Sequence, residues 1–474
     1  MLESPNPVVI ENQHGGTRDW LLERTRIDPE SRFRSPSIEG YCSRASVRAG
    51  EMISFHVSTN PRSRFVLDLY RMGYYQGAGA RRVLRLGPLP GSVEHDPPVA
   101  ARRLRECRWR ACASVTIPED WRSGVYLGRL TAERNGMQSY LIFVVRDERR
   151  ADFLFQCSDL TWQAYNRWPS RFSLYDDGEK FWAYGPDTDV SFERPYGKYC
   201  QIVDAPLSLG SGEWFLWEFP IAYWLESQGY DVTYVSGTDT HADPDGLRRV
   251  KGFLSVGHDE YYTLAMFESL QRAISDGLNV AFLSGNTCSG CIDLLPDGRG
   301  SPNRTLRRFA RFGGLPGRTA DNFPEATRLP GAAPNENTLV GARTLELFSG
   351  TADWSCTAPE HWLFRGTGMN RGEGIPGLVG WEFHAEPAEI PGLEIVASGP
   401  TASHYGKGMF TATIYPGPHG NFVFNASTCW WGDGLAEPPG YVRPGAVLSP
   451  RGPDPRVQRI TANLLERMRE SPRR

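Results

Sequence analysis

The stretch that decides the fold, residues 253–286, reads FLSVGHDEYYTLAMFESLQRAISDGLNVAFLSGN. It contains two short apolar runs, Phe253–Val256 and Val280–Ser284, which are typical of buried strands. Between these runs, apolar residues recur at the spacing of a helix: Leu264, Phe267, Leu270 and Ile274. A strand, a helix and a second strand in this order predict a βαβ unit, in which both strands are parallel neighbours in a buried sheet.

The chain on either side of this unit divides into two parts of different character. In the first part apolar residues alternate with polar ones, for example over Ile53–Val57, which predicts half-buried strands of an antiparallel, Ig-like β-sandwich. After the charged run Asp147–Arg150, short apolar strands alternate with helical patterns. We therefore expect a β-sandwich domain over residues 1–148 and an α/β domain with a parallel sheet over residues 149–474.

The composition is that of an ordinary globular protein. Its 474 residues include 52 basic and 55 acidic side chains, so a nucleic-acid partner is not expected. The N-terminus lacks the basic and apolar regions of a secretory signal, and no apolar run approaches the ~20 residues that span a bilayer. These features predict a cytoplasmic protein without a membrane partner, whose nine cysteines are reduced thiols.

Polar residues follow both strands of the βαβ unit. His258 and Glu260 come after the first strand and are two residues apart, so in an extended chain they point to the same side. Asn286 follows the second strand. Because ligands of open α/β sheets bind beyond the carboxyl ends of the strands, we predict a functional site here. An alternative, that Asp259 and Glu260 only cap the next helix, would not account for His258 or Asn286.

A long segment of weak periodicity, residues 161–199, precedes this unit. Long ordered loops are uncommon unless they are functional, although aromatic residues also fix loops by simple burial. The segment carries five tyrosines: Tyr165, Tyr175, Tyr184, Tyr196 and Tyr199.

Four motifs, in this order along the chain, resemble the catalytic region of the large (β) subunit of N,N-dimethylformamidase. They are TWQAYN at 161–166, VSFERPY at 190–196, GHDEY at 257–261 and SGN at 284–286. The N-terminal β-rich part also resembles this family, and the segment around Glu382 matches more loosely. The resemblance implies an α/β catalytic domain like that of class I glutamine amidotransferases, and a metal-dependent hydrolase that cleaves the C–N bond of a small amide.

The resemblance also implies a mononuclear Fe³⁺ site. Carried over to this chain, the ligands are Tyr165, Tyr196 and Glu260, with His258 and Asn286 close by and Glu382 as a catalytic acid. Hard, anionic oxygen ligands suit ferric iron, which would polarise the amide carbonyl and activate water. The family enzyme has a small helical subunit, and the sequence leaves open whether this protein binds one or forms a homo-oligomer.

Two other interpretations remain. A cysteine hydrolase of the amidotransferase type would use Cys288 as its nucleophile. A non-catalytic scaffold would bind carbohydrate or protein through tryptophans such as Trp430 and Trp431. Because Cys288 and Cys291 lack the second cysteine pair of a zinc site, we expect that replacing both with serine leaves turnover within a few-fold.

Overall fold

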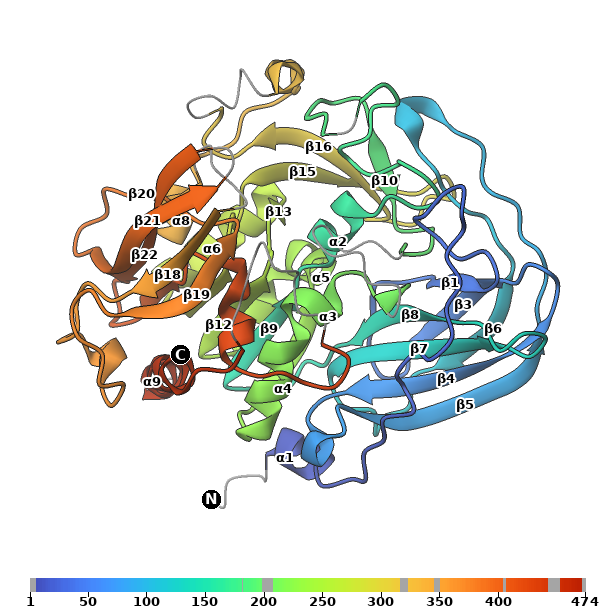
Figure 1. Ribbon diagram of the computed structural model, residues 1–474, viewed down its shortest axis with the longest axis horizontal. Coiled ribbons are helices and arrows are strands. Elements are labelled where there is room, and N and C mark those ends of the chain that lie inside the picture. The colour runs from blue at the N-terminus through green and yellow to red at the C-terminus, as the bar shows by residue number, and fades with distance from the viewer. Residues whose placement is uncertain are drawn as a thin grey trace.

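The structure, a computed structural model, describes residues 6–180, 182–197, 208–315, 323–344, 350–403, 406–441 and 452–470. A β-rich N-terminal part, drawn in blue and cyan, lies on one side of a central layer of strands and helices (Figure 1). An antiparallel extension of the central sheet, drawn in orange, lies on the other side. Within the described residues, no helix is both long and apolar enough to cross a membrane.

The N-terminal part consists of two sheets that pack over a common core. One sheet has the order β1-β3-β6 and the other β2-β8-β7-β4-β5. Ile53, Phe55 and Val57 of β3 are fully buried, as their alternation with polar residues predicts. The strands are β1 (Glu39–Cys42), β2 (Ser46–Val47), β3 (Met52–Ser58), β4 (Arg64–Met72), β5 (Ala80–Pro90), β6 (Ala111–Thr116), β7 (Gly124–Ala132) and β8 (Gln138–Val145).

The central layer is a nine-stranded sheet of order β11-β9-β12-β14-β23-β22-β21-β18-β19. β12 and β14 are parallel neighbours, with Phe253 opposite Val280, so the predicted pairing of these two strands is confirmed. The strands are β9 (Phe153–Cys157), β11 (Val232–Ser236), β12 (Gly252–Gly257), β14 (Asn279–Ser284), β18 (Gly350–Ser355), β19 (Gly374–Trp381), β21 (Glu394–Ser403), β22 (Gly406–Pro416) and β23 (Phe422–Asn425).

The sheet is mixed rather than largely parallel. From β11 to β23 neighbouring strands run parallel, but β22, β21, β18 and β19 add on in antiparallel fashion. A hairpin connection such as that between β21 and β22 can only join antiparallel strands. The expected likeness to class I glutamine amidotransferases stays a prediction, as does the domain boundary near Asp147.

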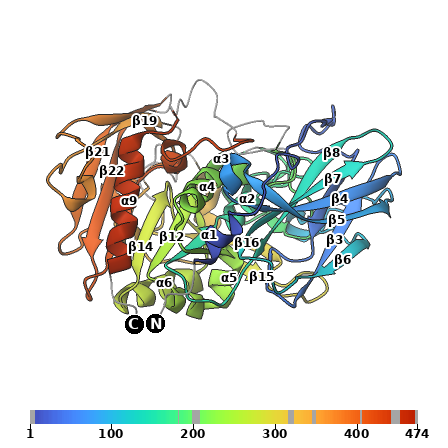
Figure 2. The same cartoon turned by 90° about the horizontal axis from the view of Figure 1, so that it is seen from below.

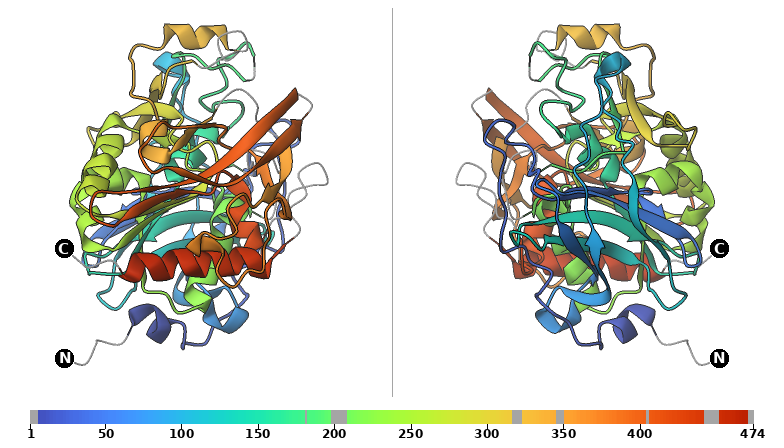
Figure 3. Two further views of the ribbon diagram at one scale, coloured as in Figure 1. Left: turned by 90° about the vertical axis from the view of Figure 1, so that its left-hand side faces the viewer. Right: turned by 90° about the vertical axis from the view of Figure 1, so that its right-hand side faces the viewer.

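Successive side chains of the parallel strands enter two separate cores. Phe155 and Val256 pack with α4 and α9, whereas Leu154 and Phe253 pack with α6 on the other face (Figure 2). In the left-hand view of Figure 3, α9 crosses below the orange strands. The helices are α1 (Pro7–Glu11), α2 (Asp159–Tyr165), α3 (Trp214–Trp217), α4 (Phe219–Ser227), α5 (Gly237–Ala242), α6 (Leu264–Ser275), α8 (Asn337–Val340) and α9 (Pro455–Glu470).

A four-stranded sheet of order β10-β16-β15-β13 arches over the carboxyl ends of the central strands (Figure 1). Its strands are β10 (Asp189–Ser191), β13 (Tyr261–Tyr262), β15 (Gly290–Leu295) and β16 (Thr305–Arg311). β13 begins directly after Glu260, and β15 begins four residues after Asn286. This small sheet therefore covers the place where the polar residues of the βαβ unit meet.

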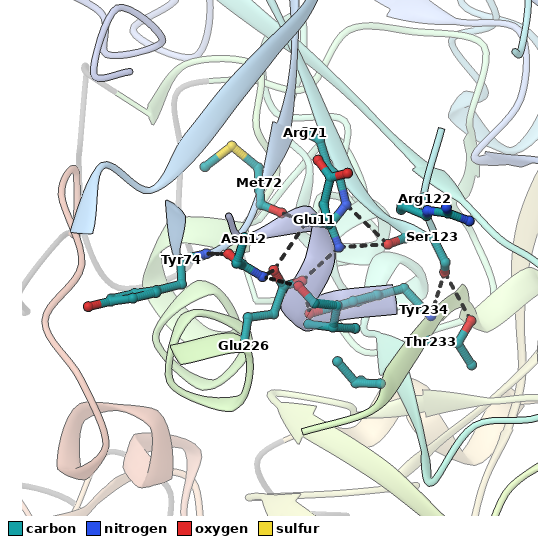
Figure 4. A network of polar contacts seen from close by, with 12 residues as sticks. Glu11, Asn12, Arg71, Met72, Tyr74, Arg122, Ser123, Glu226, Thr233 and Tyr234 are labelled. Carbon is teal, nitrogen blue, oxygen red and sulfur yellow. Dashed lines mark hydrogen bonds and ion pairs between the residues drawn. The ribbon is translucent and has the colours of Figure 1, made fainter. Parts of the chain in front are cut away.

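A buried ion pair joins the N-terminal part to the central layer. Nη2 of Arg71, on β4, lies 2.8 Å from Oε1 of Glu226, on α4, and both side chains are fully buried. Glu226 also accepts hydrogen bonds from Tyr234 of β11, at 2.9 Å, and from Asn12, at 2.8 Å (Figure 4). Arg71 further donates to the carbonyl oxygen of Ser123, at 2.8 Å. Asn12, which follows α1, thus contacts both parts.

Candidate functional site

The turn after β12 is built so that His258 and Glu260 face into the protein. Gly257 has a φ of +71°, and a Cβ there would lie 2.5 Å from the Cβ of Trp217, so only glycine fits. The buried carboxylate of Asp259 accepts hydrogen bonds that anchor the turn. Its donors are Gln156 at 2.7 Å, Ser255 at 2.8 Å and Tyr262 at 2.7 Å.

Helix α6 does not need Asp259 or Glu260 as a cap. Its N-cap is Thr263, whose hydroxyl accepts from the backbone N–H of Met266. The interpretation of the two acidic residues as a simple helix cap is therefore wrong, because the next polar residue of the chain takes that role.

His258, Glu260 and Glu382 form a buried imidazole–carboxylate group. Their ligand atoms lie within 4.8 Å of one another, so the group could hold a metal ion. Nε2 of His258 lies 3.5 Å from Oε2 of Glu260 and also contacts Oε2 of Glu382. Nδ2 of Asn286 donates to the same Glu382 oxygen at 2.9 Å. Four predicted site residues thus meet at one point.

Burial and mutual repulsion shift the pKa values of this group. Burial disfavours the protonated imidazole of His258, but the Glu382 and Glu260 carboxylates outweigh this effect and raise its pKa to about 9. Burial and the nearby Glu382 carboxylate raise the pKa of Glu260 to about 7. Such shifts are characteristic of functional sites, where titratable groups are desolvated beside specific partners.

Two phenols share the carboxylate of Glu260. The hydroxyl of Tyr165, on α2, donates to Oε2 at 2.6 Å, and that of Tyr175 donates to Oε1 at 3.1 Å. The two rings are stacked with their centroids 4.7 Å apart. Burial, together with the Glu260 charge, raises the pKa of both phenols well above the ordinary range. Both are therefore neutral unless a bound cation stabilises the phenolate.

Tyr196 lies apart from this group. Its ring packs edge-on against that of Trp162, with centroids 6.2 Å apart. The charged groups that most affect the pKa of its hydroxyl are Asp159, Arg304 and Arg194. The structure brings Tyr175, beside Tyr165, to Glu260, and the expected role of Tyr196 as a ligand stays a prediction. The sequence lists Tyr175 only as one of five tyrosines in this segment, because spacing along a long loop does not determine which of them turns inward. Tyr199 lies outside the described residues.

Sequence analysis missed His384, which supports Asn286 and Glu382. Nε2 of His384 accepts from the backbone N–H of Thr287 at 3.0 Å, and burial lowers the pKa of His384 to about 3, so the ring is neutral. Gly285 allows the same two segments to approach, since a Cβ there would lie 2.0 Å from the Glu382 carbonyl oxygen. No sequence pattern near residue 384 indicates this contact.

The structure bears on both alternative functions. Trp430 and Trp431 are fully buried, so neither is placed to stack on a sugar. Cys288 is also fully buried, and burial, together with the Glu336 carboxylate, raises its pKa well above that of a free thiol. A nucleophilic cysteine needs the opposite shift. The expectation that Cys288 and Cys291 are dispensable stays a prediction.

Asp159, near Tyr196, offers a pH-dependent test of these electrostatics. Its Oδ2 has no hydrogen-bond partner among the described residues, while Oδ1 accepts from Gly237 at 2.6 Å. Burial outweighs the Gly237 hydrogen bond and raises the pKa of Asp159 from 3.8 to about 8. The contribution of protonated Asp159 to the stability of the fold is therefore complete below about pH 4 and is lost as pH rises towards 8.

We expect Asp159→Asn to stabilise the protein increasingly as pH rises. Asparagine keeps the Oδ1 acceptor but removes the buried charge. The free energy of unfolding, measured by urea titration, should exceed that of the wild type by up to ~1.4 kcal/mol more for each pH unit between 5 and 8. Asp245→Asn, at a largely exposed side chain, is the control. Parallel pH profiles for Asp159→Asn and the wild type would contradict the assigned shift.

The fold and the site define a class of protein: mixed α/β, with a buried imidazole–carboxylate group at the carboxyl edge of the sheet that could hold a metal. The sequence profile described as "N,N-dimethylformamidase beta subunit-like, C-terminal" matches residues 66–443. The chain therefore belongs to this family, whose name points to amide hydrolysis. The matched region includes every site residue described above.

Other comparisons add little. No curated protein matches the chain. A crystal structure of an uncharacterized protein from Bacillus anthracis str. Ames is 8% identical, and the match covers 26% of this chain and 84% of that chain. Its TM-score of 0.16 is too low to support an argument about fold or function.

Proposed function

We propose that this protein hydrolyses the C–N bond of a small amide and uses one Fe³⁺ ion held by Tyr165, Tyr175 and Glu260. Family membership supports the amide as substrate. The observation that carries the metal assignment is the buried carboxylate of Glu260, which has one phenol against each of its oxygens.

The donor set fits a small, hard cation. Phenolate and carboxylate oxygens suit trivalent iron better than a soft metal. The three groups are buried within hydrogen-bond distance of one another, so their ionised forms repel unless a cation lies between them. His258, Glu260 and Glu382 make up a second donor set that shares Glu260. We prefer the oxygen donors of Tyr165, Tyr175 and Glu260 as the iron ligands, because His258 and Glu382 already pair with each other.

When bound, ferric iron supplies a Lewis acid that polarises the amide carbonyl and makes hydroxide available at neutral pH. The protein's own groups orient the substrate and move protons. In this proposal the carboxamide of Asn286 donates a hydrogen bond to the developing oxyanion. His258, protonated at neutral pH, can pass its Nε2 proton to the departing nitrogen while Glu382 stabilises the charged ring. The near-complete burial of these groups keeps bulk water away.

Reconstitution with Fe³⁺ tests the metal assignment. A ferric ion bound to phenolate absorbs visible light by charge transfer from ligand to metal, so the loaded wild type should be coloured. We expect Tyr165→Phe and Tyr175→Phe to weaken iron binding and to bleach most of this colour. Tyr196→Phe is the matched control and should retain both. Release of dimethylamine from N,N-dimethylformamide and of ammonia from formamide tests the reaction.

Other outcomes would contradict this assignment. Colour lost in Tyr196→Phe but kept in Tyr175→Phe would restore the ligand set expected from sequence. A colourless protein that loses its metal on His258→Ala would favour the imidazole–carboxylate set. Iron-loaded protein that hydrolyses none of several small amides would refute the proposed reaction.

A further inference from the structure

Arg308 is a fully buried arginine at the centre of β16, beside the candidate site. Its side chain points inward, whereas that of its neighbour Arg307 points outward and pairs with Asp189 at 2.6 Å. This difference follows from the alternation of side chains along a strand. Among the described residues, no carboxylate lies within ion-pair distance of Arg308. A buried charge without such a partner is costly, so its surroundings must compensate it in another way.

Arg308 holds both ends of the segment that carries Tyr175. One nitrogen, Nη1, donates to the carbonyl oxygen of Leu174 at 3.4 Å and to that of Gly185 at 3.2 Å. These two carbonyls are eleven positions apart in the sequence. A single side chain thus closes the loop that brings Tyr175 to Glu260.

Arg308 also places its charge against the tyrosines themselves. The guanidinium carbon lies 4.8 Å from the ring centroid of Tyr175 and 4.0 Å from that of Tyr184. Nη2 donates to the hydroxyl of Tyr261 at 3.2 Å, and this hydroxyl lies 2.5 Å from that of Tyr175. The positive charge of Arg308 therefore interacts with Tyr175 directly, at the face of its ring, and indirectly, through the hydrogen-bonded hydroxyl of Tyr261.

We propose that Arg308 is a positioning residue of the candidate site, which fixes the Leu174–Gly185 segment and holds a positive charge beside Tyr175. This inference rests on the proposed function, in which Tyr175 is a metal ligand. Groups that orient and polarise ligands from behind commonly affect metal affinity by ~10–100-fold. A cation beside a phenolate also stabilises the phenolate electrons and so raises the energy of charge transfer to iron.

The test compares Arg308→Met, Arg308→Lys and the control Arg307→Met in the full chain. For Arg308→Met we expect Fe³⁺ affinity to fall ~10–100-fold and the visible band to move to longer wavelength. Arg308→Lys keeps the charge but cannot donate to both carbonyls and Tyr261, so its band should lie between those of Arg308→Met and the wild type. A purely structural role would lower metal content without moving the band. Arg307→Met should behave like the wild type.

Hydrogen exchange of the metal-free protein gives an independent readout. The backbone N–H of Ala183 donates to the carbonyl of Tyr175 at 3.1 Å, inside the segment that Arg308 holds. This amide should exchange faster in both Arg308 variants than in the wild type and in Arg307→Met. If Arg308→Met fails to fold, Arg308→Lys decides: faster exchange at Ala183 supports the proposal, and wild-type exchange overturns it.

The failure of this inference is distinguishable from that of the proposed function. A coloured wild type whose affinity, band position and Ala183 exchange are all unchanged in Arg308→Met would overturn the role of Arg308 alone. A wild type that binds no Fe³⁺ would refute the proposed metal site. In that case the exchange of Ala183 in the metal-free variants still tests whether Arg308 holds the segment, and unchanged exchange would overturn the proposal.

Discussion

Glu260→Gln should abolish iron retention and reduce amide hydrolysis to background. The substitution keeps the shape of the side chain but removes the negative charge that both Tyr165 and Tyr175 contact. Loss of an anionic ligand should cost more than the ~10–100-fold in metal affinity that loss of an outer partner costs. Iron content after gel filtration, visible absorbance and the rate of amine release measure the three effects.

Two control variants separate loss of metal from loss of catalysis. Glu268→Gln makes the same chemical change on the exposed face of α6 and should leave iron and turnover unchanged. Asn286→Ala should retain iron and colour but lower turnover ~10²–10³-fold, the usual cost of removing one oxyanion donor. Full iron retention by Glu260→Gln would show that the iron binds elsewhere.

Arg71→Met should destabilise the protein by ~3–5 kcal/mol, because it leaves the Glu226 carboxylate buried and unpaired. Both side chains of this pair have no exposed surface, and Glu226 lies on α4, in the layer that packs against the N-terminal part. The free energy of unfolding, from urea titration at pH 7, measures the change. We expect the iron site of the folded fraction to keep its visible band, since Arg71 does not contact it.

The double variant Arg71→Met/Glu226→Gln provides the decisive comparison. It removes both charges, so it should recover part of the stability that the single change loses. Arg467→Met, which removes an exposed i,i+3 pair on α9, should change stability by less than ~1 kcal/mol. A single Arg71→Met variant as stable as the wild type would mean that the buried network contributes no net stability.

The sequence alone determined those parts of the fold and site that depend on local pattern. The apolar runs at 253–256 and 280–284 with a helical stripe between them specify the parallel pair β12 and β14. Once these strands are parallel neighbours, residues just beyond their carboxyl ends must lie close together. His258, Glu260 and Asn286 can therefore be predicted as a group from the sequence.

Only the tertiary structure decided features that depend on contacts between distant segments. The antiparallel extension of the sheet follows from chain connections that burial patterns do not encode. Tyr175 contacts Glu260 from a loop whose Leu174 and Gly185 carbonyls accept hydrogen bonds from Arg308, more than 120 residues further along. Likewise, His384 supports Asn286 from a segment almost 100 residues away. Side-chain direction in a long loop is set by such packing partners, and their identity is absent from the local sequence.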